Sequence, residues 1–256
     1  MKTINIVRSL TLAAALLGAA SVQAQSPDQI AQDVLAKNPV IDGHNDAPEQ
    51  IAERFASDFS QFARLRQGGV GGQFWSVWID PELPEFEAVQ RVIEQIDIVH
   101  RLVDTYPDDL QLALTADDVE SALQNGRIAS LIGMEGGHSI GNSLAVLRQT
   151  YALGARYMTL THWKTLDWAD SATDAPKSDG LSEFGVSVVH EMNRLGMIVD
   201  ISHVSEATMN DANLRTLLCQ CGKPRLGRWT EGRNSARGST LSRRRGRTCS
   251  PSGEME

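Results

Sequence analysis

Short apolar segments alternate with longer amphipathic ones along most of the chain. The short segments are rich in β-branched and aromatic residues, and each has the length of a buried strand. They occupy residues 39–42, 73–79, 128–134, 156–160 and 197–201. The pattern therefore predicts five strands, and Trp75 and Trp78 in the second one are expected to pack in the core.

The segments between these strands have the spacing of apolar residues that is typical of helices. The longest spans 85–106, ends before Pro107 and carries apolar residues on one face, namely Val89, Val92, Ile93, Ile96, Val99, Leu102 and Val103. Three further helices are expected at 116–124, 143–153 and 182–195. Strands that alternate with helices imply a parallel sheet, so the expected fold class is α/β.

The amino-terminal residues have the composition of an export signal. Lys2 and Arg8 precede an apolar run at 10–20, and the small residues of 22–24 suit a cleavage site. The run is shorter than the roughly 20 residues that span a bilayer. We therefore expect a signal peptide over residues 1–24 and an exported protein, periplasmic or secreted. The remaining composition, with 41% hydrophobic residues in the 256-residue chain, is that of a globular protein.

The charge of the chain changes sign near residue 212. Residues 1–212 carry 14 Lys and Arg against 29 Asp and Glu, whereas residues 213–256 carry 10 against 3 and hold all three cysteines. A basic tail for nucleic acid or membrane, a disordered linker and an out-of-frame translation are the three interpretations. We favour the last, because an exported protein has little access to nucleic acid and the composition resembles random coding.

Five side chains with metal-ligand chemistry follow the ends of the predicted strands. His44 and Asp46 come after the first strand and, two positions apart, point to the same side of an extended chain. Glu135 follows the third strand, His162 the fourth and His203 the fifth. In a parallel barrel the carboxyl ends of all strands face one rim. The five residues therefore predict a metal site, and imidazole and carboxylate ligands suit zinc, with manganese or cobalt as alternatives.

Other titratable residues near these motifs are expected to have structural roles. His100 and His190 lie within predicted helices, and surface or interface positions are expected for both. His138, three residues after Glu135, is expected to form a structural hydrogen bond. Asp170 either orders the loop after the fourth strand or contacts a substrate, and the sequence leaves both roles open.

Four phrases of the chain, in this order, resemble the membrane (renal) dipeptidase family of zinc hydrolases. They are IDGHND (41–46), GGQFWS (71–76), SLIGMEGGHS (130–139) and DISHVS (200–205). The resemblance runs from about residue 30 to about residue 211. It implies a (β/α)8 TIM-barrel metallohydrolase and a binuclear zinc centre, whose bridging hydroxide hydrolyses the peptide bond of dipeptides.

The resemblance also implies roles for the candidate site residues. His44 and Asp46 would bind one zinc, Glu135 would bridge both ions, and His203 would bind the second. His162 would face the substrate and polarise the scissile carbonyl or stabilise the oxyanion. Two ions roughly 3.5–4 Å apart can hold a hydroxide and polarise a carbonyl together. Lactonases and deaminases of the same barrel commonly begin with His-x-His, whereas this chain has His-x-Asp.

The chain departs from the family after residue 211. Members of the family have another histidine for the second zinc and an arginine for the substrate carboxylate, and no histidine follows His203 here. We therefore expect an incomplete barrel with about five of eight β/α units over residues 25–212, and an Arg-rich, Cys-containing tail over 213–256.

The expected function is that of a zinc-dependent dipeptidase, or metallopeptidase, that is impaired in this truncated chain. The alternative is a non-catalytic remnant that binds one metal ion or none. A dipeptide is the expected substrate, and no nucleic-acid partner is expected. A homodimer and contact with the periphery of a membrane stay open.

Overall fold

The fold is described from a computed structural model, which covers residues 25–54 and 61–219 of the chain. The signal peptide expected over residues 1–24 and most of the expected tail lie outside these residues. The chain divides into two compact units, Met1–Pro224 and Arg225–Glu256, and all described residues belong to the first. None of the helices in this described part is both long and apolar enough to cross a membrane.

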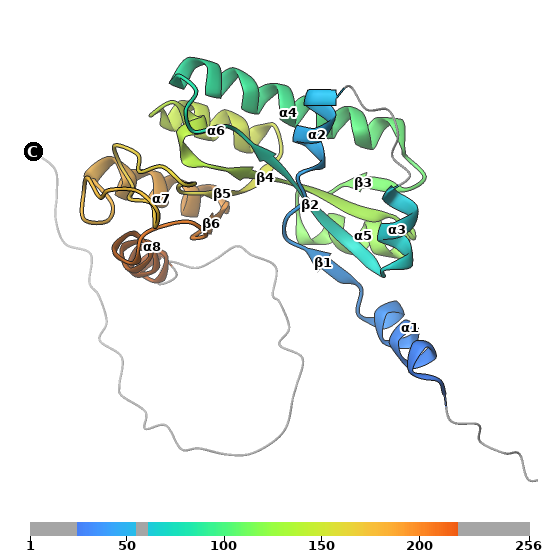
Figure 1. Cartoon of the computed structure of the whole chain (residues 1–256). Coiled ribbons are helices and arrows are strands. Elements are labelled where there is room, and N and C mark those ends of the chain that lie inside the picture. Colours follow the sequence, from blue (N-terminus) through green and yellow to red (C-terminus); the bar gives the residue numbers. More distant parts are fainter. Residues whose placement is uncertain (1–24, 55–60, 220–256) are drawn as a thin grey trace, which may run out of the picture. The chain divides into compact units, whose positions relative to one another are not determined.

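The described strands form one parallel sheet (Figure 1). They are β1 (Val40–Asp42), β2 (Val70–Trp78), β3 (Leu110–Leu112), β4 (Ile128–Glu135), β5 (Ala155–Thr159) and β6 (Ile198–Asp200). Hydrogen-bonded neighbours follow the order β1-β2-β4-β5-β6, while β3 pairs with the first residues of β4. The five predicted strands are confirmed. Strand β3 is an additional one that the apolar pattern did not indicate.

Nine helical segments accompany the sheet within the described residues. They are α1 (Pro27–Lys37), α2 (Ala47–Arg54), α3 (Gln61–Gln67), α4 (Glu85–Thr105), α5 (Ala116–Gln124), the 3-10 helix η1 (Gly137–Ile140), α6 (Leu144–Ala152), α7 (Glu183–Leu195) and α8 (Glu206–Cys219). The four predicted helices are confirmed as α4, α5, α6 and α7, each within one residue at either end. Helix α8 crosses residue 212, where the sequence analysis placed the end of the barrel domain.

Local capping explains where several of these helices begin and end. The side chain of Thr115 accepts a hydrogen bond from the Asp118 N–H, and the Asp118 side chain accepts one in return, which forms a capping box for α5. The side chain of Ser182 accepts a hydrogen bond from the Gly185 N–H at the start of α7, and Gly196 ends this helix in a left-handed conformation at φ +78°. Strand β6 begins two residues after Gly196.

Apolar side chains pack on both faces of β4, which is buried along its whole length. Ile132 and Met134 belong to a large cluster that includes the apolar face of α4, whereas Ala129 and Leu131 belong to a smaller cluster beside α5. Because side chains alternate along a strand, Glu135 lies on the face of the smaller cluster. Its carboxylate therefore points away from the large core.

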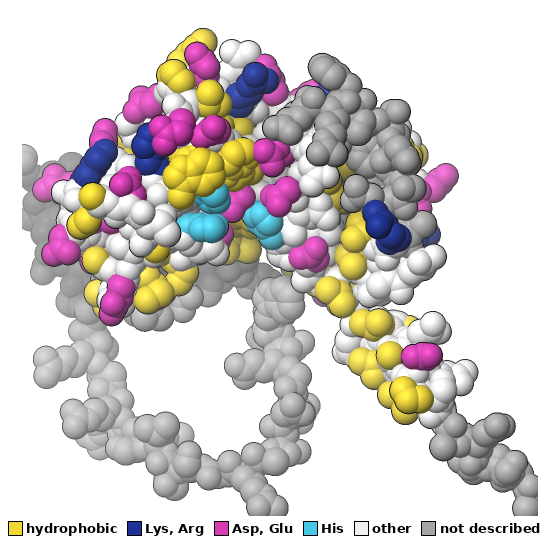
Figure 2. Space-filling model, viewed as in Figure 1, with side chains coloured by type: hydrophobic (Ala, Val, Ile, Leu, Met, Phe, Trp, Pro, Cys, Tyr) yellow, Lys and Arg dark blue, Asp and Glu magenta, His cyan; other side chains and the backbone are white. Residues whose placement is uncertain are grey.

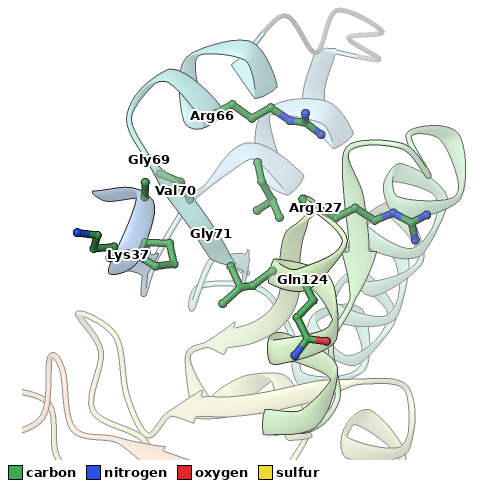
Figure 3. Close-up of a pocket in the computed structure, with 12 residues that line it drawn as sticks. Lys37, Arg66, Gly69, Val70, Gly71, Gln124 and Arg127 are labelled. Atoms are coloured by element: carbon green, nitrogen blue, oxygen red, sulfur yellow. The ribbon is translucent and has the colours of Figure 1, made fainter. Parts of the chain in front are cut away.

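A cavity of about 470 Å3 lies at the amino ends of β1, β2 and β4 (Figure 3). Pro39, Val70 and Ile128 line it where these strands begin. Lys37 and Arg127 stand on opposite sides of the cavity and extend away from one another (Figure 3). The cavity is thus at the opposite end of the strands from the predicted metal-site residues.

Candidate metal centre

The five predicted metal-site residues lie together at the carboxyl ends of the strands. They form two groups, in each of which the ligand atoms lie within 4.8 Å of one another: His44 with Asp46 and Glu135, and Glu135 with His162 and His203. Histidine side chains gather beside acidic ones on this face of the molecule (Figure 2). Glu135 belongs to both groups, so the two groups share one carboxylate.

The two oxygens of Glu135 face different histidines. Oε2 lies 3.4 Å from Nε2 of His44, whereas Oε1 lies 3.4 Å from Nε2 of His162 and 3.3 Å from Nε2 of His203. The hydroxyl of Ser76 donates a hydrogen bond to Oε2 at 3.3 Å. Only 7% of Glu135 is exposed. Its carboxylate is therefore held between two sets of donors in the manner of a bridging ligand.

The charges of this site are strongly coupled. Burial works against the ionised form of Glu135, but the hydrogen bond from His44 and the charges of the neighbouring imidazoles outweigh burial and lower the pKa of this carboxyl. The same hydrogen bond, with further help from Asp46, raises the pKa of His44 to about 9 against the opposing effect of burial. The carboxylates of Glu135 and Asp46 therefore favour a positive charge beside Nε2 of His44, whether a proton or a metal ion carries it. Burial lowers the pKa of His162, which favours the neutral form of this ring.

Tyr157 orients His44. Its hydroxyl lies 3.2 Å from Nδ1 of His44, while Nε2 of the same ring lies 3.0 Å from Oδ1 of Asp46. A Cβ atom at Gly133, which is paired in register with Tyr157, would overlap the tyrosine ring. Burial raises the pKa of Tyr157, which therefore stays neutral. Glycine at position 133 thus makes room for the ring that holds a candidate ligand.

Trp78 orients His162. The indole N–H of Trp78 donates to Nδ1 of His162 at 3.5 Å, a long hydrogen bond. With Nδ1 as acceptor, a neutral imidazole carries its hydrogen on Nε2, the atom that faces Glu135. The prediction that Trp78 packs in the core is therefore wrong, because this ring is only half-buried and lies at the site. The same prediction is confirmed for Trp75, which is 1% exposed.

Hydrogen bonds to backbone oxygens hold the two histidines of the second group. Ser171 Oγ lies 2.6 Å from the carbonyl oxygen of His162 and 3.3 Å from that of His203. The His203 carbonyl also accepts from Thr161 Oγ1 at 3.1 Å and from the N–H of Ala172 at 2.8 Å. His203 has a left-handed backbone, with φ +63°, which is uncommon for a residue other than glycine. These bonds stabilise that conformation.

Asp170 orders the loop between β5 and α7. Its carboxylate is fully buried and accepts hydrogen bonds from the N–H groups of Lys177, Ser178 and Gly180 at 2.7, 3.2 and 2.8 Å. Burial works against its charge, but these N–H groups outweigh burial and lower the pKa of Asp170. Of the two roles that the sequence left open, the structure shows the contacts of loop ordering.

The other histidines of the described residues lie outside both groups. His100 Nε2 lies 2.7 Å from the carbonyl oxygen of Leu153, and His190 is exposed on α7. Burial lowers the pKa of His138 to about 4. Hydrogen bonds with the backbone of Ile79 and Asp80 oppose this effect of burial. They agree with the structural role that the sequence predicted for His138.

A parallel half-barrel with a shared carboxylate at its strand ends belongs to the class of barrel metallohydrolases. The family model of the membrane dipeptidases, Peptidase family M19, matches residues 28–216. The chain therefore belongs to the membrane dipeptidase family, a family of metallopeptidases. This confirms both the resemblance and the incomplete α/β barrel that the sequence predicted.

Individual relatives support this assignment. The chain is similar to the dipeptidase verJ of Clonostachys rogersoniana, with 43% identity over 198 residues, which are 68% of this chain and 51% of the relative. The chain thus spans about half the length of that relative.

Solved structures show the same fold. The probable dipeptidase PvdM from Pseudomonas aeruginosa aligns with a TM-score of 0.65 and 20% identity over 75% of this chain and 54% of its own. A metallopeptidase from Rhodobacter sphaeroides, liganded with a phosphinate mimic of the dipeptide L-Ala-D-Ala, aligns with a TM-score of 0.63 and 21% identity over 70% of this chain and 62% of its own.

Proposed function

We propose that this protein is a zinc-dependent dipeptidase whose active site is the cluster around Glu135. The observation that carries the proposal is that each oxygen of this buried carboxylate faces a separate set of donors. A carboxylate placed in this way would hold two metal ions a short distance apart. Two such ions would polarise the carbonyl group of the substrate and would make a water molecule nucleophilic at neutral pH.

The donor set fits zinc. His44, Asp46 and Glu135 would hold the first ion, and Glu135 and His203 would hold the second. Imidazole nitrogen and carboxylate oxygen are preferred zinc ligands, and three protein ligands are usual at a catalytic zinc site. The first position has three such ligands, whereas the second has two by this assignment. We therefore expect the second ion to bind more weakly, and the 256-residue chain to turn over dipeptides slowly.

His162 would act on the substrate rather than on a metal ion. The Trp78 indole leaves the imidazole hydrogen on Nε2, so this atom can donate to the oxygen of the scissile carbonyl. A metal ligand would need a free electron pair on the same atom. A donor placed at a developing oxyanion contributes a factor on the order of 10² to 10³ in rate.

A dipeptide is the proposed substrate class. The family and the relative verJ are dipeptidases by description, and the Rhodobacter sphaeroides structure holds a phosphinate mimic of L-Ala-D-Ala. We expect hydrolysis of simple dipeptides such as Ala-Ala by the zinc-loaded chain, and loss of that hydrolysis on addition of a chelator.

A zinc titration of four proteins tests the shared carboxylate. The metal-free wild-type chain, Asp46→Asn, His203→Ala and Glu135→Gln are compared by isothermal titration calorimetry. We expect two sites in the wild type. Asp46→Asn should weaken zinc binding only at the first position, and His203→Ala only at the second position. Glu135→Gln should weaken zinc binding at both positions.

Two outcomes of this titration contradict the proposal. If Glu135→Gln weakens only one site, the carboxylate does not bridge. If the wild type binds a single ion and releases no amino acids from Ala-Ala, the chain is the non-catalytic remnant that the sequence left as the alternative.

We also propose that the protein is exported, as the composition of residues 1–24 indicates. Expression of the full chain followed by cell fractionation and amino-terminal sequencing tests this, and a mature protein beginning at Gln25 is expected. Recovery in the cytoplasm with Met1 retained would contradict export. Sedimentation of the purified protein decides between a monomer and a homodimer.

A further inference from the structure

An aromatic wall lies beside His162. It consists of Trp78 at the end of β2 and Trp163, which follows His162 directly. The ring centroids of Trp78 and Trp163 are 5.6 Å apart, and the Trp163 centroid is 4.6 Å from that of His162. A hydrophobic patch borders the histidines on this face of the molecule (Figure 2). The wall therefore lies on the side of Glu135 that faces His162 and His203.

Trp163 is exposed although its ring contacts the half-buried ring of His162. It is 40% exposed, whereas Trp75 and Trp168 are each 1% exposed. A large aromatic ring left in water forgoes the stabilisation that its burial would provide. Packing of the described core therefore does not account for the position of Trp163, and a ligand that covers it would.

Local contacts hold the backbone of the wall in place. The hydroxyl of Thr173 donates to the carbonyl oxygen of Trp163 at 3.0 Å. The next residue, Lys164, forms an ion pair with Glu82, which lies between β2 and α4. The segment that carries Trp163 is thus tied to two other parts of the chain, and its ring is presented at the edge of the site.

We propose that Trp78 and Trp163 form a subsite for an aromatic or large aliphatic side chain of the dipeptide. The inference rests on the proposed function, because it takes the scissile carbonyl to lie at Nε2 of His162. Both side chains of a dipeptide are within a few bonds of that carbonyl, so one of them reaches rings that contact His162. Indole faces bind apolar and aromatic groups by area burial and by ring contacts.

Binding of matched inhibitors tests the subsite. The zinc-loaded full chain is titrated with three phosphinate dipeptide mimics. One has hydrogen at both side-chain positions, and each of the other two has a benzyl group at one of these positions. From a ring contact of ordinary strength, we expect one benzyl mimic to bind roughly 3- to 10-fold more tightly than the glycine mimic.

Variants of Trp163 test whether the aromatic wall causes the preference for the benzyl mimic. Trp163→Ala should abolish the preference for benzyl, whereas Trp163→Phe should retain most of it. Phe86→Ala is the matched control, because Phe86 is an aromatic residue on α4 that is 80% exposed and belongs to neither metal group. This variant should retain the full preference.

The outcomes separate the subsite from the function. Zinc-dependent binding without a benzyl preference, or a preference that survives Trp163→Ala, would overturn the subsite and leave the dipeptidase proposal standing. If none of the mimics binds in the presence of zinc, the proposed function fails and the subsite with it.

Discussion

Trp78 and Tyr157 each act on a candidate site histidine through one polar atom. Neither was assigned to the site from sequence, although His44, Asp46, Glu135, His162 and His203 were. A ligand motif can be recognised because its residues follow strand ends that meet at one rim. Which residue lies close enough to orient a ligand depends on which strands are neighbours in the sheet. Trp78 pairs in register with Glu135, and Tyr157 with Gly133, and these registers are invisible in the sequence.

Replacement of Trp78 by Phe keeps an aromatic ring and removes the donor to His162 Nδ1. We expect kcat to fall about 10-fold with little change in KM, because orienting partners of this kind typically contribute 10- to 100-fold. The nitrogen chemical shifts of His162 should show hydrogen on Nδ1 in place of Nε2. Trp163→Phe is the control for the tautomer alone, since it removes an indole for which no hydrogen bond to His162 is seen. An unchanged tautomer in Trp78→Phe would contradict this role.

Replacement of Tyr157 by Phe removes the hydroxyl beside His44 Nδ1. We expect the affinity of the first zinc position to fall about 10-fold, because a ligand imidazole loses the partner that fixes its orientation. The second position should be unaffected. Calorimetric zinc titration measures both, with Tyr151→Phe as the control on α6. Equal weakening of the two positions would show that the tyrosine acts on the fold and not on His44.

At the scale of elements, the long periodic helices and the buried strands were predicted within a few residues. Strand β3 was missed because it has only three residues with Gln111 in the middle, too short a pattern to stand out. Helix α1 was missed despite a clear start signal, Ser26 as the N-cap followed by Pro27. The conformation of the loop around Asp170 could not be predicted. Its carboxylate accepts hydrogen bonds from N–H groups seven to ten residues further along the chain, and no pattern in the sequence indicates these contacts.

Replacement of Asp170 by Asn should destabilise the loop after β5. The asparagine amide cannot accept all the hydrogen bonds that the carboxylate accepts from these N–H groups. We therefore expect a loss of about 2 kcal/mol in the free energy of unfolding at pH 7. The pKa of Asp170 is lowered in the folded state, so its contribution is present above the pKa of the unfolded chain and is lost as the pH falls through the folded pKa. Urea unfolding at several pH values measures this.

The difference between Asp170→Asn and the wild type should therefore shrink in acid. Asp179→Asn is the control, because this residue is exposed in the same loop and its left-handed backbone, φ +51°, is tolerated by asparagine. A pH-independent difference would show that the carboxylate charge does not stabilise the loop.

Replacement of Gly133 by Ala should disturb β4. The added Cβ would overlap the ring of Tyr157 in the neighbouring strand, and overpacking of this kind costs about 1–3 kcal/mol. We expect the free energy of unfolding to fall by that amount, together with weaker zinc binding at His44. Gly43→Ala is the control, because a Cβ there meets nothing within 4 Å. Equal stability of the two variants would contradict the packing argument.

At the scale of the whole molecule, the described sheet has open edges at β1 and β6, and the short strand β3 also has a single neighbour, β4. Strands β1 and β6 each pair with a single neighbour, and Ile41 and Ile198 on them are 47% and 56% exposed. Unpaired apolar strands at an edge promote association between chains. The half-barrel was expected from the five predicted strands, and these exposed residues are its consequence.

Replacement of Ile198 by Lys tests this consequence. A charge on an edge strand opposes strand pairing between molecules. We expect the mass measured by static light scattering to fall towards that of a single chain. Leu214→Lys, an equally exposed apolar residue on helix α8 (60%), should have a smaller effect. If both variants lower the mass alike, general solubility and not the β6 edge accounts for the change.

Gly133 has a wider consequence for how this kind of site is recognised. The residues of a metal centre are usually sought among those that donate electron pairs, yet at this candidate centre a position without a side chain makes room for the ring beside His44. A homologous sequence could keep every ligand and still lose His44 as a well-oriented donor through one added methyl group two residues before Glu135. Gly-x-Glu at the end of this strand is therefore a better marker of a working centre than the glutamate alone.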